Sequence, residues 1–212
     1  YSPDILGHRI LIDVKHLNAV SRKEYYAGFV LPSIGTKDPI PVIASHVAYS
    51  GKEKLQDLID GMDYETDNKF TERNGHKFNN WNINFCDEDV ITIFRSKGLI
   101  GINLDQRVLG ISKEDIGLND THVSYIWQNI KGMMLAVIRA KGTEISSRKG
   151  LSDIFCLGTD FDGFIDPLNS YSTVMKFEQL GEDLINVIKN DPDKGKLLRN
   201  MKAENFVRKF CF

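Results

Sequence analysis

The chain lacks the sequence features that mark several large classes of protein. Among its 212 residues only three are cysteines, an odd number without the spacing of a metal site or a disulfide framework. No apolar run approaches the roughly 18 residues that a membrane-spanning helix needs, and no Gly-x-Gly-x-x-Gly turn of a dinucleotide-binding domain occurs. With 27 basic and 29 acidic residues the net charge is only −2, so nothing indicates nucleic acid or a membrane surface as a partner.

What the chain has is the composition of an ordinary soluble globular domain. It is 42% hydrophobic and 26% charged, and it is long enough to form one sizeable core. It begins at Tyr1 with neither an initiator methionine nor a signal peptide, so we expect that residues upstream are missing. The compartment stays open because a targeting signal would lie there, and the oligomeric state stays open with a homodimer among the alternatives.

Four short apolar runs predict the strands of a parallel sheet. They cover residues 9–16, 41–46, 99–104 and 154–157. Helical signals lie between and after them, at residues 21–31 (opened by a Ser21–Glu24 capping box), 52–61, 87–97, 121–140, 177–189 and 196–210, and a short helical turn is expected at residues 2–7. This alternation is typical of α/β folds in which right-handed crossovers join parallel strands.

The number of strands suggests an incomplete structure. Four parallel strands alone would leave two unpaired edges, which parallel sheets tolerate poorly, whereas a (β/α)8 TIM-type barrel has eight strands and about 250 residues. We therefore expect residues 1–212 to be a single domain that supplies the second half of such a barrel, strands 5–8, with the N-terminal half upstream or on another chain. Residues 47–82 and 105–120 are expected to be inserted loops, the first without periodic structure from Tyr64 to Trp81.

Three of the predicted strands end in, or are followed by, residues of types that can bind metal ions. His16 and His46 close the first two apolar runs, and Asp160 follows the fourth. Parallel strands bring their carboxyl ends to one edge, where α/β folds place their chemistry. Neutral imidazole and carboxylate are zinc ligands in hydrolytic sites, and Asp160 is either a ligand or a general base. Two plainer interpretations stay open: hydrogen-bonded histidines at a sheet rim, and Asp160 as a turn or capping residue.

Five motifs in order and rough spacing resemble the membrane (renal) dipeptidase family, binuclear zinc peptidases with an amidohydrolase-like (β/α)8 barrel. They are Asp13-Val14-Lys15-His16-Leu17, Pro41-Val42-Ile43-Ala44-Ser45-His46, Gly101-Ile102-Asn103, Gly158-Thr159-Asp160-Phe161-Asp162-Gly163 and Glu204-Asn205-Phe206-Val207-Arg208-Lys209-Phe210. The resemblance implies that His16 and His46 bind the second of two zinc ions, and that Asp160 moves protons to and from the bridging water. It further implies that Asp162, Gly163 and Asn84 belong to the substrate site.

The chain departs from the family pattern at several points. The family's His-x-Asp pair, bridging Glu and substrate-contacting His all precede the region present here. Ile83 stands where the family has an Arg that grips the carboxylate of a dipeptide, and an apolar side chain cannot make that contact; Arg73 is one candidate to replace it. Lys15 stands where the family usually has Ser, and its charge is unfavourable beside a metal site unless the side chain points outward.

The sequence therefore predicts a zinc-dependent hydrolase resembling a dipeptidase, which cleaves an amide bond of a small peptide with a metal-bound hydroxide. The alternative is a degenerate, non-catalytic barrel that binds a ligand or partner through its inserted loops. Two further residues receive structural assignments. His122 is expected at the surface in the first turn of a long helix, and Cys156 is expected to be a small core residue.

Overall fold

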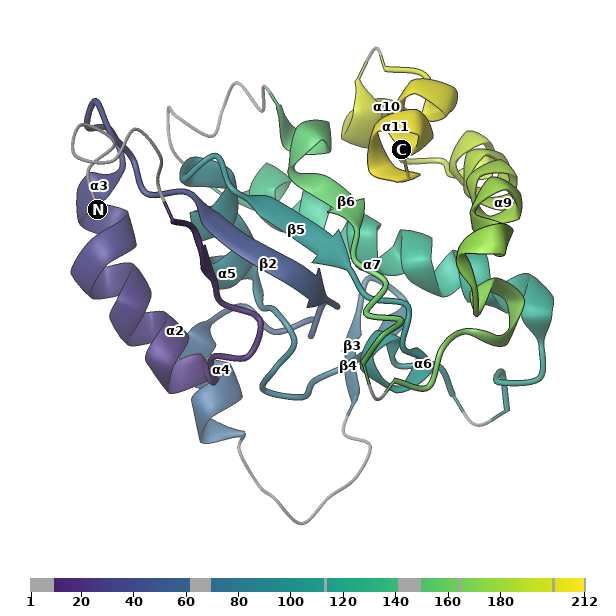
Figure 1. Ribbon diagram of the computed structural model, residues 1–212, viewed down its shortest axis with the longest axis horizontal. Helices are drawn as coiled ribbons and strands as arrows, with labels where there is room; N and C mark the ends of the chain where they lie inside the picture. Colours follow the sequence, from purple (N-terminus) through teal and green to yellow (C-terminus); the bar gives the residue numbers. More distant parts are fainter. Residues whose placement is uncertain are drawn as a thin grey trace.

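The computed structural model describes residues 10–61, 70–112, 114–140, 150–163, 165–199 and 201–211. A four-stranded parallel sheet forms its centre, in the order β1-β2-β5-β6 (Figure 1). The strands are β1 (Ile12–Asp13), β2 (Val42–Val47), β5 (Leu99–Ile102) and β6 (Phe155–Leu157). The four predicted strands are thus confirmed as parallel neighbours, although β1 is shorter than expected. The helical turn expected at residues 2–7 lies outside the described residues.

Helices flank this sheet and largely match the predicted segments. They are α2 (Ala19–Tyr25), continued by the π-helix Tyr26–Val30 and by α3 (Leu31–Ser33), then α4 (Leu55–Asp60), α5 (Asp87–Arg95), α6 (Gln106–Leu109), α7 (Asn119–Arg139), α9 (Phe177–Asn190), α10 (Lys194–Leu198) and α11 (Ala203–Cys211). Short 3-10 turns cover Leu151–Ile154, Asn169–Tyr171 and Val174–Lys176. The described part of the chain is therefore a mixed α/β structure.

Two helix predictions were wrong in detail. The first helix begins two residues earlier than expected, because the side chain of Asn18 rather than Ser21 is its cap and accepts a hydrogen bond of 2.9 Å from the Ser21 N–H. The last helix is divided into α10 and α11. Arg199, which follows α10, has φ 56° and ψ −115°, a backbone conformation that cannot continue a helix.

The first predicted insertion contains regular structure that the sequence interpretation missed. Strands β3 (Phe70–Arg73) and β4 (His76–Asn79) form an antiparallel hairpin. Asn74 and Gly75 both have positive φ, 53° and 76°, as a two-residue type I′ turn requires. The Asn-Gly pair was thus the signal for this hairpin, inside a segment whose polar composition resembled an irregular loop.

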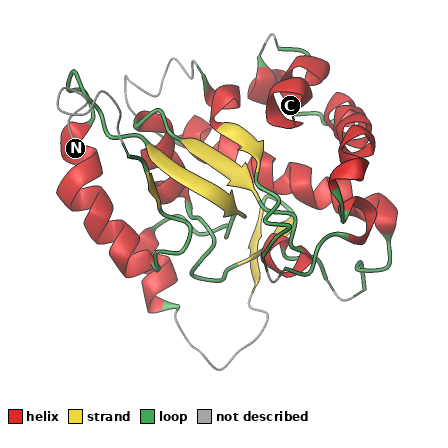
Figure 2. Ribbon diagram, in the orientation of Figure 1, coloured by secondary structure: helices red, strands yellow, loops and turns green. Residues whose placement is uncertain are grey.

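The helices lie beside and behind the sheet, so they cover one of its faces (Figures 1 and 2). On that covered side the fully buried Ile100 and Ile102 of β5 belong to one core with residues of α7 such as Ile130. On the opposite face Ser45 is exposed and Ile43 and Cys156 are only partly buried, so the core assignment of Cys156 holds in part. Among the described residues no helix is both long and apolar enough to cross a membrane.

Candidate functional site

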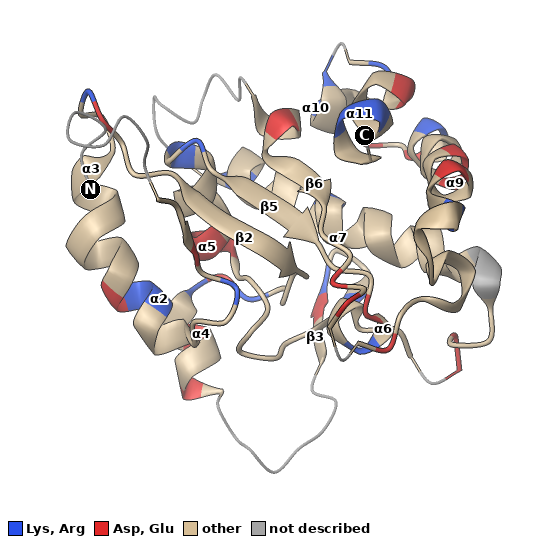
Figure 3. Cartoon of the chain, viewed as in Figure 1, with Lys and Arg blue, Asp and Glu red and all other residues tan. Residues whose placement is uncertain are grey.

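The structure brings together the three predicted site residues at the carboxyl edge of the sheet. The ring centroids of His16 and His46 are 5.1 Å apart, with their planes inclined at 59°. Nε2 of His46 lies 3.5 Å from Oδ2 of Asp160. Together with Asp13, Lys15 and Ser45, we call these residues the strand-end cluster. Acidic residues lie on the loops that follow the sheet close to α6 (Figure 3).

A β-bulge at the end of β2 shapes the position of His46. The pairing of β2 with β5 advances three residues, from Ala44 to Val47, while β5 advances two. The carbonyl oxygen of Ser45 there approaches Gly101 of β5 and Gly158 after β6 so closely that a Cβ at either glycine would lie 1.9 Å from it. Two glycines on neighbouring segments therefore make room for the bulge that places His46 at the edge.

Asp13 links the loop that carries His16 to the strand that carries His46. Its Oδ1 accepts hydrogen bonds from the backbone N–H groups of Ser45 (3.1 Å) and Lys15 (3.0 Å). Burial by itself raises the pKa of Asp13, but the hydrogen bonds from Ser45 and Lys15 outweigh it and lower that pKa. Ser45 Oγ in turn lies 2.7 Å from Nδ1 of His46. This chain of contacts fixes the orientation of the His46 ring and leaves Nε2 for Asp160 or a ligand.

Asp160 lies in a turn and has an uncommon backbone conformation, of a kind that is often found at functional sites. Its φ is 58°, a left-handed conformation that is uncommon outside glycine but more frequent for Asp. The Gly163 N–H donates a hydrogen bond of 2.8 Å to the Asp160 carbonyl, and a Cβ at Gly163 would lie 2.6 Å from Asp160 Oδ1. Gly163 thus shapes the space of the carboxylate, while Asp162 is exposed on the same turn.

The electrostatic environment favours the neutral form of His46. Burial lowers its pKa most, the positive charge of Lys15 lowers it further, and Asp160 opposes both. A neutral imidazole is the form that binds a metal ion. The donor types at this edge therefore suit zinc. Within the described residues, however, no group of three or more His, Cys, Asp or Glu side chains is close enough to form a complete metal site.

Lys15 does not point outward, so its charge is unfavourable for a metal ion at this edge of the sheet. The residue is only 2% exposed, and its Nζ has no hydrogen-bond partner in the part of the chain that the structure describes. Burial and the charge of Arg22 lower the pKa of Lys15 to about 8, against the opposing charges of Asp160, Asp105 and Asp13. The position of this side chain was missed because the residue type gives no indication of which way it turns after β1.

Asn84, expected in the substrate site, is fully buried. Its amide nitrogen donates to the backbone carbonyls of Asn79 (2.8 Å) and Val108 (3.0 Å), which connects the end of β4 to α6. A side chain with no exposed surface and both donors bound to backbone cannot contact a substrate in this conformation. The substrate-binding prediction for Asn84 is therefore not supported, and its visible role is to hold the hairpin against the body of the domain.

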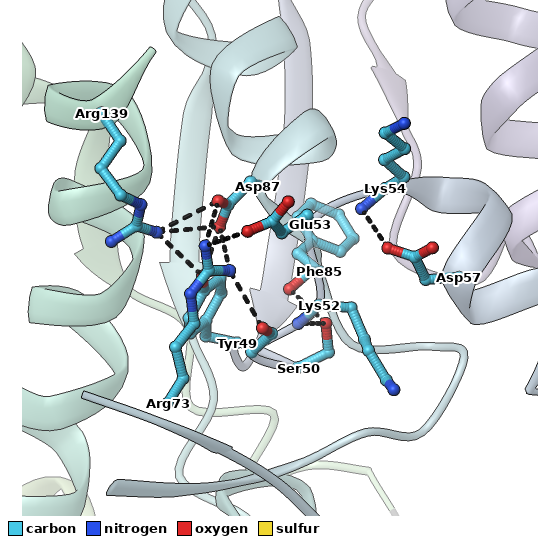
Figure 4. A network of polar contacts seen from close by, with 11 residues as sticks. Tyr49, Ser50, Lys52, Glu53, Lys54, Asp57, Arg73, Phe85, Asp87 and Arg139 are labelled. Carbon is cyan, nitrogen blue, oxygen red and sulfur yellow. Dashed lines mark hydrogen bonds and ion pairs between the residues drawn. The ribbon is translucent and has the colours of Figure 1, made fainter. Parts of the chain in front are cut away.

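Arg73 is held in a network of its own, which we call the hairpin network (Figure 4). Its guanidinium binds Asp87 (3.0 Å), Glu53 (3.1 Å) and the Tyr49 hydroxyl (3.0 Å). Asp87 also pairs with Arg139 at 3.1 Å and accepts a hydrogen bond from Tyr49. These contacts fasten β3 to the start of α5 and the end of α7. Arg73 is therefore engaged inside the protein, which argues against a role in gripping a substrate carboxylate.

The surface prediction for His122 was wrong. The residue is fully buried in the first turn of α7, with Nδ1 2.9 Å from Ser170 Oγ and Nε2 3.2 Å from the Ile116 carbonyl. Both ring nitrogens have protein partners, so His122 is a structural histidine. The 3-10 turn Asn169–Tyr171, which carries Ser170, covers this part of α7, and no local pattern in the helix reveals that covering segment.

Comparison with known proteins assigns the chain to no family. No protein-family model matches it, and no curated protein matches it significantly.

Proposed function

We propose that this chain is part of a metal-dependent hydrolase that cleaves an amide bond in a small peptide. The observation that carries the proposal is the contact between His16 and His46, with Asp160 beside them, at the carboxyl edge of a parallel sheet. Catalytic groups of α/β folds lie at this edge. The resemblance of the strand-end motifs to the dipeptidase family supports the same reaction class.

The spacing of the side chains fits a metal ion. Two imidazoles bound to one tetrahedral ion through Zn–N bonds of about 2.1 Å have ring centroids roughly 5 Å apart and donor atoms about 3.4 Å apart. His16 and His46 have centroids 5.1 Å apart, and His46 Nε2 is 3.5 Å from Asp160 Oδ2. We assign His16 and His46 as zinc ligands, in a complete site of two ions. When bound, the metal supplies acidity to a water molecule and polarises the amide carbonyl.

The residues of the chain supply proton transfer and orientation. Asp160, set by its left-handed turn and by the space at Gly163, is the group that accepts a proton from the attacking water and returns it to the leaving amine. Asp13 and Ser45 hold the ring of His46. Asp162 is exposed on the Asp160 turn, where it can contact a substrate.

We further propose that the sheet is the second half, strands 5–8, of a (β/α)8 barrel. Parallel sheets are normally covered on both faces, whereas the described helices leave one face of this sheet without a helix (Figure 2). In the described residues, β1 and β6 each pair with one strand only. Four further strands would cover the inner face, pair with both edges and bring additional metal ligands to the strand-end cluster.

The test compares wild-type full-length protein with His46→Asn and with a matched control, His76→Asn, in the hairpin. Zinc content after metal loading and dialysis, and hydrolysis of a panel of dipeptides, are measured for each. We expect the wild type and the control to bind zinc and hydrolyse the substrate. In His46→Asn we expect zinc affinity to fall by about 100-fold or more, since even the loss of a residue that only supports a ligand costs about 10- to 100-fold.

A folded wild-type protein that retains no zinc above a blank would contradict the proposal. Zinc binding without turnover of any peptide, with any divalent metal, would favour the degenerate barrel instead. Because His76 lies on β4 and not in the strand-end cluster, an equal loss in both variants would also count against the assignment of His46.

A further inference from the structure

The loop after β6, which carries Asp160, is fastened on both sides of the Asp160 turn to the end of β5 and the residues that follow it (Figure 1). Before the turn, the Gly158 N–H donates a hydrogen bond of 3.0 Å to the Ile102 carbonyl. After it, the Leu168 N–H donates one of 2.9 Å to the Leu104 carbonyl. The position of the turn therefore depends on the segment after β5 as well as on β6.

Asp105 supplies the side-chain part of this fastening. Its Oδ2 accepts a hydrogen bond of 3.2 Å from the Asp166 N–H, while the Gln106 N–H donates one of 2.9 Å to the Asp166 carbonyl. Both backbone groups of Asp166 are thus held by two consecutive residues after β5. The other oxygen of Asp105, Oδ1, accepts from the Arg107 N–H at 2.8 Å and so caps α6.

The surroundings of Asp105 make its carboxylate a fixed acceptor. The residue is 2% exposed, and its own N–H donates a hydrogen bond of 2.5 Å to the buried side chain of Asn103. Burial by itself raises the pKa of Asp105, but the hydrogen bonds from Arg107 and from the Asp166 N–H outweigh it and lower that pKa. The folded protein therefore favours the ionised carboxylate, whose two oxygens can only accept hydrogen bonds.

The capping of α6 accounts for only one of the two oxygens of Asp105. The other binds Asp166, three residues after Gly163, whose N–H closes the Asp160 turn by donating to the Asp160 carbonyl at 2.8 Å. A shift of Asp166 is therefore transmitted over a short stretch of chain to the turn. A group that transfers a proton must be held close to its productive position, and a displacement of about 1 Å can cost roughly 100-fold in rate.

We propose that Asp105 is a positioning residue for Asp160, which acts by fixing the loop after β6 against the segment after β5. The proposal rests on the proposed function in calling Asp160 the group that transfers the proton, but the effect of Asp105 on the turn can be measured without turnover. Asp105 does not touch the substrate in this assignment. It acts through Asp166 and the turn that ends at Gly163.

The test compares Asp105→Asn with the control Arg107→Met in the full-length protein. Asparagine keeps one acceptor oxygen, so it cannot both cap α6 and hold Asp166, whereas Arg107→Met removes the guanidinium that pairs with Asp105 and leaves both carboxylate oxygens in place. The backbone amide signal of Gly163 is recorded by NMR, and kcat, KM and zinc content are measured with a hydrolysed dipeptide.

In Asp105→Asn we expect the Gly163 signal to shift and kcat to fall about tenfold or more, while KM and zinc content stay within about twofold of wild type. We expect Arg107→Met to match the wild type in all four measurements. A loss confined to kcat is the result that separates positioning of Asp160 from a general loss of structure, which would also change KM and zinc content.

An unchanged Gly163 signal in folded Asp105→Asn would overturn the proposal. If that variant does not fold, Asp105→Ser takes its place, because serine caps a helix but is too short to reach Asp166. Equal changes in Arg107→Met would count against it too, since that variant retains the Asp166 contact. A shifted Gly163 signal with an unchanged kcat would reduce Asp105 to a structural role and refute the positioning role.

The outcome is separate from that of the proposed function. A wild-type protein that hydrolyses no peptide refutes the hydrolase proposal, yet a Gly163 shift confined to the Asp105 variant still establishes that Asp105 positions the Asp160 turn. Hydrolysis by the wild type together with an unchanged kcat in Asp105→Asn gives the reverse result.

Discussion

Two buried cations near the start of the chain differ sharply in their surroundings. Arg22 is fully buried and donates to both oxygens of Asp89, at 2.9 and 3.3 Å. It also binds three backbone carbonyls and lies 5.0 Å from the ring centroid of Phe85. Lys15 is almost equally buried, yet its Nζ binds no described residue.

The comparison separates a buried charge that has protein partners from one whose Nζ has none among the described residues. Burial by itself lowers the pKa of Arg22, but the charge and hydrogen bond of Asp89 outweigh it, so the folded protein favours the charged form. For Lys15 burial dominates and the pKa falls to about 8, so the folded protein disfavours the charged form. A fully partnered buried cation can stabilise the fold, whereas an unpartnered one is a cost to its stability.

The variant Arg22→Met tests whether the contacts of Arg22 stabilise the fold, and it has the largest expected effect. The variant leaves Asp89 buried without its partner, and breaking a buried ion pair on one side typically costs about 3–5 kcal/mol. We therefore expect a loss of that size in the free energy of unfolding, measured by urea denaturation, with Lys23→Met as the exposed control. A loss no larger than that of the control would show that the Arg22 contacts do not stabilise the fold.

The second prediction concerns the geometry of the strand-end cluster, through Gly163→Ala. The added Cβ would lie 2.6 Å from Asp160 Oδ1, so the carboxylate must shift from its place beside Gly163 and its contact with His46 must change. The clash is with the end of a side chain that can rotate, so we expect the loss of stability to remain near the lower end of the roughly 1–3 kcal/mol range for overpacking. The measurement is the NMR signals of the His46 ring, which we expect to shift.

Gly28→Ala is the matched control for that variant. Gly28 lies within the helical segment after α2, and a Cβ there would have no atom within 4 Å. We expect the His46 signals of Gly28→Ala to match the wild type. If Gly163→Ala also leaves them unchanged, Asp160 is not held against His46 by this turn.

The strands and the two histidines were predictable because their signals are local. An apolar run that ends in His or in a Gly-x-Asp turn marks both a buried strand and its polar end, and parallel pairing then brings such ends to one edge. The meeting of His16, His46 and Asp160 follows from that rule alone. The asparagine-glycine turn of the hairpin was equally local, and it was missed because the surrounding polar segment was taken as irregular.

Other features depend on segments far apart in the sequence and were not predictable. The bulge at Ser45 requires glycines at positions 101 and 158, on two other segments. His122 is covered by the 3-10 turn that carries Ser170, and Asn84 is buried by contacts with β4 and α6. In each case tertiary packing determines how buried the side chain is and which groups it contacts. Residue type and periodicity do not predict that packing.

The last prediction, Lys15→Met, sharpens the comparison because it is the same substitution type as Arg22→Met. Methionine fills a similar volume and removes a buried charge that has no described partner. Replacement of buried charged groups by apolar ones is often neutral or stabilising, so we expect the free energy of unfolding to change by about 1 kcal/mol or less, or to rise. Urea denaturation without added ligand measures it. A loss as large as that expected for Arg22→Met would mean that Lys15 has a stabilising partner in the free protein, and the distinction between the two cations would fail.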